Sequence, residues 1–387
     1  MSDPLFKIVM FCPQFRPVVG GAERQAEKLA VALVAAGCQV KILTPRIELN
    51  SPDREENNGV VVERFPLTDL AQRYPMKGVA LLNIPYILWQ VVQAVRPHLK
   101  DMAVLHCHSA SLQTAGAALA GRIAGIPVLC KAAVADCRSD LGEIEKSGAS
   151  GRWVAWLARA VIGTWVATTS AVADALMRAG VKPDKITRIP NGVEQSTVSR
   201  TRPRVNGARR FLYLGRLSAN THRDTPTLIK AFDRLAVESS DIELALVGGG
   251  DLYDETQRLA DASPVRKRIH LPGFDQPEKW LAWADCFVLP SRREGLSNAL
   301  LEAMAAGLPC IANDIPPNRE VLDDGKAGLL TPVGDCNALE NAMRKMIEGS
   351  GIAEHYARMA RERVEQCYTI SAVAESYLKL YRKLCRV

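Results

Sequence analysis

Several common signatures are missing from this 387-residue sequence. It has no dense run of Lys and Arg, so nucleic acid is not expected among its partners. None of its ten cysteines forms a Cys-x-x-Cys pair, which favours buried, reduced thiols in a cytoplasmic protein. The amino-terminal segment lacks a basic stretch followed by an apolar one, so no signal peptide is predicted.

A membrane-spanning helix is not predicted either. The most apolar long stretch, residues 78–95, has nearly the length of a span. Polar residues and a proline interrupt it, which favours a buried or interfacial helix: Asn83, Pro85, Gln90 and Gln93. The net charge is +7, and residues 1–195 hold 22 basic against 17 acidic residues, a share of +5. An ordinary mixed surface is the favoured explanation of this excess. The alternative is attraction to phosphate-bearing substrates or to anionic lipid, the latter on the inner face of a membrane.

The order of strand-like and helix-like segments predicts an α/β protein. Short apolar runs such as KIVMF alternate with helical periodicity, which indicates parallel sheets covered on both faces. The alternation pauses in a polar, basic stretch and then restarts, so two α/β domains are expected. The predicted divisions are an amino-terminal domain over 1–195, a linker over 196–209, a second domain over 210–366 and a final helix over 367–387 that crosses back to the first domain.

The first candidate site is the loop after the first strand. It leads into Gly20 and Gly21, which open a helix and allow close approach of an anion to free backbone N–H groups. A flexible turn is the competing interpretation. The spacing is not G-x-G-x-x-G, and the same holds for Gly248 to Gly250, which we interpret mainly as a turn.

The second candidate site follows a buried strand that ends at Pro290. Glu294 lies in the loop, and Ser297 is the expected N-cap of a helix that ends at Gly307. Backbone N–H groups of Gly295, Leu296 and Ser297 would suit a phosphate. Glu302 lies about five residues into the helix, and a pair of carboxylates suits the hydroxyl groups of a sugar.

The third candidate site follows another strand. Gly215 permits a tight turn, and Arg216 offers a planar set of donors to a diphosphate. Arg223 lies in the polar loop that follows. Arg209 and Arg210, before the strand, are weaker candidates for the same role, and each of these arginines could instead be an ordinary surface charge.

These motifs resemble those of family 4 of the retaining glycosyltransferases, over nearly the whole chain. The resemblance rests on GGAER at 20–24, IPNGV at 189–193, LGRLS at 214–218, EGLSNALLEAMAAGLP at 294–309 and NREVLDDGKAGLL at 318–330. It implies the GT-B fold, two facing Rossmann-like domains with a deep cleft between them. It also implies a nucleoside-diphosphate sugar as donor and a glycan or lipid-linked acceptor, in the biosynthesis of a polysaccharide or glycoconjugate.

The resemblance also implies roles for individual residues. Glu294 would hold the donor sugar, Glu302 the ribose and Arg216 the diphosphate. Gly20 and Gly21 would approach the reacting centre. The strand and turn ending at Gly273 and Phe274 would touch the base through backbone groups. With Arg223 beside the leaving group, the expected catalytic residues are Glu294, Arg216 and Arg223.

Two features depart from the family pattern. Arg223 stands where a Lys is common, after a longer loop, and Ala133 stands where many members have a His. Lys131 and Asp140 instead resemble a subgroup with a Lys in this strand. No Asp-x-Asp lies near the donor site, so no metal or other cofactor is expected. His106 and His108 lack an evident third ligand and are interpreted as wall or core residues.

Three functions remain open on the sequence alone. A retaining transferase is the leading hypothesis. A nucleotide-sugar epimerase or hydrolase of the same fold is the second, and a non-catalytic subunit that binds a nucleotide sugar is the third. The simultaneous presence of both glutamates, Arg216 and the glycine pair favours an enzyme over a pure binder.

Overall fold

A computed structural model describes residues 4–17, 20–48, 50–73, 79–132, 140–146, 148–195, 207–219 and 222–386. The chain forms two compact units, Met1–Gly192 with Ile370–Val387, and Val193–Thr369. The boundary between Thr369 and Ile370 assigns the last helix to the first unit, although this helix follows the second unit in the chain. Most of the predicted linker, residues 196–206, lies outside the described residues.

The first unit contains an eight-stranded sheet in the order β3-β4-β2-β1-β5-β6-β7-β8. All neighbouring strands are parallel except β3, which pairs antiparallel with β4. The strands are β1 (Lys7–Phe11), β2 (Gln39–Pro45), β3 (Arg54–Asn57), β4 (Val60–Phe65), β5 (Val104–His108), β6 (Val128–Ala132), β7 (Thr164–Ala167) and β8 (Ile186–Arg188).

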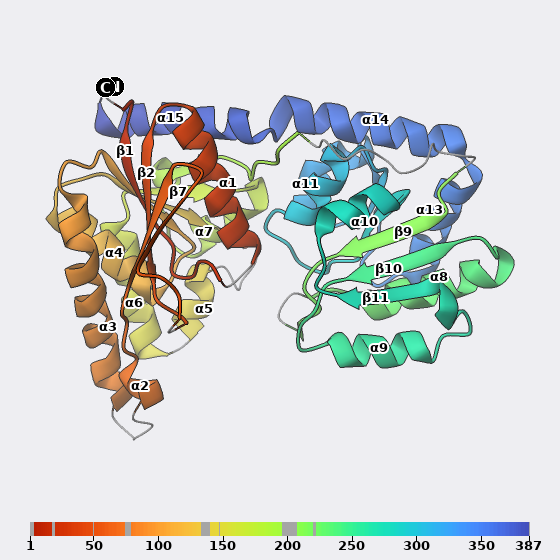
Figure 1. Ribbon diagram of the computed structural model, residues 1–387, viewed down its shortest axis with the longest axis horizontal. Coiled ribbons are helices and arrows are strands. Elements are labelled where there is room, and N and C mark those ends of the chain that lie inside the picture. The colour runs from red at the N-terminus through yellow and green to blue at the C-terminus, as the bar shows by residue number, and fades with distance from the viewer. Residues whose placement is uncertain are drawn as a thin grey trace. The chain divides into compact units, whose positions relative to one another are not determined.

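Helices cover both faces of this sheet. Val9 and Phe11 pack toward α3, α4, α6 and α7, whereas Ile8 and Met10 pack toward α1 and α15. Figure 1 shows α15, the last element of the chain, beside α1 and β1. The helices of the unit are α1 (Gly21–Ala35), α2 (Leu70–Arg73), α3 (Val79–Val95), α4 (Leu112–Ile123), α5 (Asp140–Lys146), α6 (Ala149–Val161), α7 (Ser170–Arg178) and α15 (Ile370–Cys385), with short 3-10 turns η1 (Arg96–Leu99) and η2 (Pro183–Lys185).

The second unit contains a six-stranded, fully parallel sheet in the order β11-β10-β9-β12-β13-β14. Its strands are β9 (Arg210–Leu214), β10 (Glu243–Val247), β11 (Ile269–Gly273), β12 (Cys286–Leu289), β13 (Cys310–Asn313) and β14 (Leu329–Thr331). Its helices are α8 (Thr225–Glu238), α9 (Tyr253–Asp261), α10 (Pro277–Trp283), α11 (Asn298–Ala305), α12 (Pro316–Val321), α13 (Cys336–Glu348) and α14 (Ser350–Cys367), with 3-10 turns η4 (Arg266–Arg268) and η5 (Asp323–Gly325).

Both sheets reverse their strand order at one place. Counted within the second unit, the order is 3-2-1-4-5-6, and the switch lies between β9 and β12. In the first unit the switch lies between β1 and β5. Open α/β sheets bind ligands outside the carboxyl ends of the strands at such a switch. The loops after β1, β9 and β12 are therefore the places where this fold favours a binding site.

The predicted α/β architecture is confirmed, and the apolar run KIVMF is strand β1. Three of the observed strands lack an apolar run of comparable length: β3, β8 and β14. β3 has the sequence REEN, which carries no apolar signal, and the other two are only three residues long. None of the nine described cysteines forms a disulfide, and six of them are buried.

Candidate active site

The loops after β9, β10 and β11 are joined through their backbones. The N–H of Leu217 donates to Gly249 O at 2.9 Å, and the N–H of Gly248 donates to Gly273 O at 2.9 Å. A Cβ on Gly248 would overlap the carbonyl oxygen of Gly215, and Gly248 has a φ of +144°. The glycine triplet is thus a turn, as predicted, but it also lets three loops pack together at the carboxyl edge of the sheet.

Arg216 projects from the first of these loops and is exposed. The hydroxyl of Tyr213 donates to the carbonyl of Arg216 at 3.3 Å, which fixes the backbone there. Asp251 holds the residues that follow, because its carboxylate accepts from Ser218 and from the N–H of Ala219. The Ser218 hydroxyl is the main reason that the pKa of Asp251 is lowered, with a smaller contribution from Arg216.

The central polar group of this unit is formed by Arg223, Ser291 and Glu294. Nη1 of Arg223 contacts both the hydroxyl of Ser291 and the Oε1 carboxylate oxygen of Glu294. The Ser291 hydroxyl also donates to the same oxygen at 2.8 Å. The side chains of Arg223 and Glu294 are 15% and 9% exposed, and Ser291 is fully buried. Two predicted site residues are therefore direct partners.

A second set of contacts holds this group in place. Residues 222–224 and 290–292 form a short antiparallel bridge, in which Asp224 N–H donates to Pro290 O at 2.7 Å. Arg292 forms an ion pair with Asp224 at 2.8 Å. Asp224 is also the N-cap of α8, so the loop carrying Arg223 is tied both to a helix and to the loop of Glu294.

Burial sets the electrostatics of Arg223. Loss of hydration lowers its pKa, and the same effect raises the pKa of Tyr213 to about 12. The Nε of Arg223 is buried and has no hydrogen-bond partner among the described residues. Because buried donors are nearly always satisfied, this N–H is a donor still available to a ligand.

Glu294 leads into the helix that carries Glu302. Ser297 is the N-cap of α11, as predicted, and its hydroxyl accepts from Leu300 N–H at 3.4 Å. Gly295 and Leu296 are buried just before the cap. Glu302 lies in the second turn of α11 and is half-buried. The structure thus places all of these residues on one loop and helix after β12.

The predicted base contacts lie at the end of β11. Gly273 has a φ of +76°, which favours glycine, and Phe274 follows it with 75% of its surface exposed. A Cβ on Gly249 would press on the Phe274 ring. The ring therefore rests on a glycine of the neighbouring loop and presents its other face to solvent.

The glycine pair Gly20–Gly21 lies in the first unit. Gly20 is the N-cap of α1 and Gly21 its first residue, with extended backbone at Gly20. The Glu23 carboxylate folds back over Gly20, so a Cβ there would overlap it. The loop before the pair is described only in part, and Ala133 lies outside the described residues.

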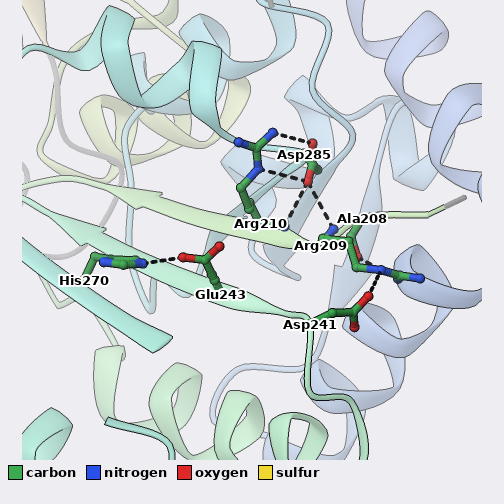
Figure 2. Close-up of polar contacts among 7 residues, drawn as sticks. All are labelled: Ala208, Arg209, Arg210, Asp241, Glu243, His270 and Asp285. Atoms are coloured by element: carbon green, nitrogen blue, oxygen red, sulfur yellow. Dashed lines mark hydrogen bonds and ion pairs between the residues drawn. The ribbon is translucent and has the colours of Figure 1, made fainter. Parts of the chain in front are cut away.

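Arg209 and Arg210, the weaker candidates for the leaving-group role, are wrong for it. They stand at the amino end of β9, opposite to the end that bears Arg216. Figure 2 shows Arg210 with Asp285 and Arg209 with Asp241, the latter at 2.6 Å. Arg210 also lies over the ring of Trp283. Both arginines therefore brace the amino edge of the sheet.

Sequence reasoning missed Ser291, Asp224 and Asp251. Ser291 had a readable signal, since it lies between a buried strand and Glu294 in the same motif. Asp224 directly precedes a helix that begins with Thr-Pro, which marks an N-cap. Within the described residues, no group of three or more His, Cys, Asp or Glu has metal-site geometry, and no helix is long and apolar enough to cross a membrane.

Each of the two units matches a model of a known protein family. The glycosyl transferase 4-like domain matches residues 20–192, and glycosyl transferases group 1 match residues 208–349. The phosphatidyl-myo-inositol mannosyltransferase of Mycobacterium leprae is 28% identical over 97% of this chain and 96% of its own.

Two solved structures share the fold. HepE of Anabaena, solved in complex with UDP-glucose, has a TM-score of 0.75 at 18% identity and covers 98% of this chain and 100% of its own. Sucrose-phosphate synthase of Thermosynechococcus elongatus has a TM-score of 0.76 at 22% identity, covering 98% and 99%. The fold of this chain is thus that of the GT-B transferases.

Proposed function

The chain belongs to glycosyltransferase family 4, and from this premise we propose that it is a retaining enzyme that uses a nucleoside-diphosphate sugar. The acceptor would be a glycan or a lipid-linked molecule. The names of the matched relatives are those of transferases and synthases, which favours transfer over an epimerase, a hydrolase or a non-catalytic subunit.

One observation carries the proposal. At the strand switch of the second unit, a buried arginine, Arg223, is held against a carboxylate, Glu294, by a buried hydroxyl, Ser291. A carboxylate oriented in this way can accept hydrogen bonds from sugar hydroxyls. The Nε of Arg223 remains as a donor for the oxygen of the leaving diphosphate.

Arg216 supplies the second positive charge of the proposed donor site. Negative charge grows on the β-phosphate as the bond from sugar to oxygen breaks, so fixed donors there stabilise the transition state most. In the proposed front-face substitution, a donor phosphate oxygen accepts the proton of the acceptor hydroxyl. The sugar then keeps its anomeric configuration.

We further propose that catalysis needs no metal ion. Arg216 and Arg223 would neutralise the diphosphate, with help from N–H groups at the start of α11. Turnover should therefore persist in excess chelator. Loss of activity in chelator that magnesium or manganese restores would contradict this part of the proposal.

Two measurements test the activity itself. A thermal-shift screen of nucleoside-diphosphate sugars should find a donor that stabilises the protein, by about 2.7 kcal/mol at 100 times its dissociation constant. With that donor, NMR of the product should show a retained anomeric configuration. Inversion, or no stabilisation by any donor, would refute the proposal.

A lipid-linked acceptor would bring the first unit to a membrane surface. Apolar side chains are unusually exposed there: Leu82 and Trp89 on α3, and Trp153 and Trp156 on α6. Exposed Arg152 flanks the tryptophans on α6, and tryptophan beside a basic residue is typical of side chains at a membrane interface. We propose peripheral contact with anionic lipid through these helices.

A further inference from the structure

One face of the first sheet changes character along its strands. Toward the amino ends, the face under α1 and α15 is apolar, with Val104 on β5 and Leu129 on β6. Toward the carboxyl ends, the same face carries His106, His108 and Lys131, all of them buried. This polar cluster lies at the edge where α/β sheets bind ligands, and the proposed donor contacts do not use it.

The geometry brings the three side chains together. His108 on β5 and Lys131 on β6 are register partners on parallel strands, so their side chains leave the same face side by side. The rings of His106 and His108 stack at 4.4 Å. A residue of α15 holds the ring of His106 in place, because Nδ1 of His106 lies 2.8 Å from the hydroxyl of Tyr381.

Nothing among the described residues balances this cluster. No described carboxylate pairs with Lys131, which is 6% exposed and whose pKa is shifted by burial alone. Nε2 of His106, Nε2 of His108 and the hydroxyl of Tyr377 are buried without hydrogen-bond partners. Burial lowers the pKa of Lys131 only to about 8, so its ammonium is mostly charged at neutral pH. A buried charge without a partner is costly, and so are several unsatisfied polar groups beside it.

We propose that Lys131 and His108 form a binding site for an oxyanion of the acceptor substrate, a phosphate or a carboxylate. The ammonium supplies the charge and the His108 ring supplies a donor at Nε2. His106 and Tyr381 position the ring of His108 without touching the ligand. The assignment of the oxyanion to the acceptor rests on the proposed transferase function. The existence of the site follows from contacts within the first unit alone.

Stability without ligand gives the first test. Replacing a buried, unpaired ammonium by an apolar side chain of similar length removes a penalty, so Lys131→Met should raise the Tm, by about 2–4 °C or more. Lys182→Met, at an exposed lysine of the same unit, should leave the Tm unchanged. A lower Tm in Lys131→Met would overturn the proposal, because it would mean that a carboxylate of this chain neutralises Lys131.

Binding gives the second test. Inorganic phosphate is titrated calorimetrically at constant ionic strength, with and without a nucleoside diphosphate that saturates the donor site. The wild-type protein should bind phosphate in both cases. Lys131→Met and His108→Ala should weaken it at least tenfold, and Lys182→Met should not.

The outcomes separate this site from the donor site. Phosphate binding that disappears when nucleoside diphosphate is present would overturn the assignment, because it would place the anion at the donor diphosphate. Equal binding by wild type and Lys131→Met would overturn it as well. Failure of every nucleoside diphosphate to bind would refute the proposed donor chemistry, while phosphate binding that depends on Lys131 would still support the site.

Discussion

Arg223 and Glu294 allow a test that separates catalysis from stability. Their side chains are 15% and 9% exposed, so Arg223→Met leaves a mostly buried carboxylate without its cation. Breaking such a pair from one side typically costs 3–5 kcal/mol of folding free energy. Ser291 still donates to Glu294 in the variant, so we expect about 3 kcal/mol, measured by urea unfolding.

The double variant Arg223→Met, Glu294→Gln removes both charges and should recover most of that free energy, because a neutral amide needs no cation. Turnover should not recover. Losing one donor at the leaving group costs about 10²–10³ in turnover, and the double variant also loses the carboxylate. Arg223→Lys should keep the charge but lose the planar geometry, so its turnover should stay low. Normal turnover in Arg223→Met, or a double variant as unstable as the single one, would refute the reasoning.

Further predictions concern the loops, the buried histidine and the membrane surface. Gly248→Ala should destabilise the second unit by about 1–3 kcal/mol and weaken nucleotide binding, because the added Cβ would overlap Gly215 O. Gly351→Ala in α14 places its Cβ in open space, so it should stabilise the protein by about 0.4–1 kcal/mol. Urea unfolding measures both changes. Burial lowers the pKa of His108 to about 3, with Lys131 adding to the effect, so the unfolded chain binds more protons below pH 6.5. Stability should therefore fall as pH drops from 6.5 toward 3, less steeply in His108→Gln, and an identical pH profile would contradict this account. In flotation with anionic liposomes, the double variant Trp153→Ser, Trp156→Ser should bind less than the wild-type protein. Val237→Ser, at an exposed site of the second unit, should bind as the wild type does. Equal flotation of the wild type and both variants would exclude α6 as the contact.

The sequence predicts the strands of both sheets better than their order. Apolar runs such as KIVMF and CFVL are short and continuous, and burial on both faces makes them so. The order of the strands depends on which edge each crossover helix takes, and no local pattern records that choice. The position of the strand switch, and hence of the site, could be placed only through the motifs that resemble the family.

The contacts within the site show the same limit. The motif marked Glu294, and the polar loop marked Arg223, but their pairing joins two loops that are far apart in the chain. The pairing depends on a β-bridge between Arg223 and Ser291, which are 68 residues apart. No periodicity in the sequence predicts this bridge. The sequence therefore suggested that the whole guanidinium of Arg223 is available to phosphate, whereas the structure shows its Nη1 engaged with a carboxylate and its Nε without a partner among the described residues.

The two ends of β9 show why residue type alone misleads. Arg210 and Arg216 are separated by one short strand and look equivalent in sequence. Arg210 forms an ion pair with Asp285 and lies over the ring of Trp283, so its charge is already balanced within the fold. Arg216 follows the carboxyl end, where a glycine and joined loops bring backbone and side chain to the switch between β9 and β12. Direction along a parallel strand thus decides which arginine braces the sheet and which can meet a ligand.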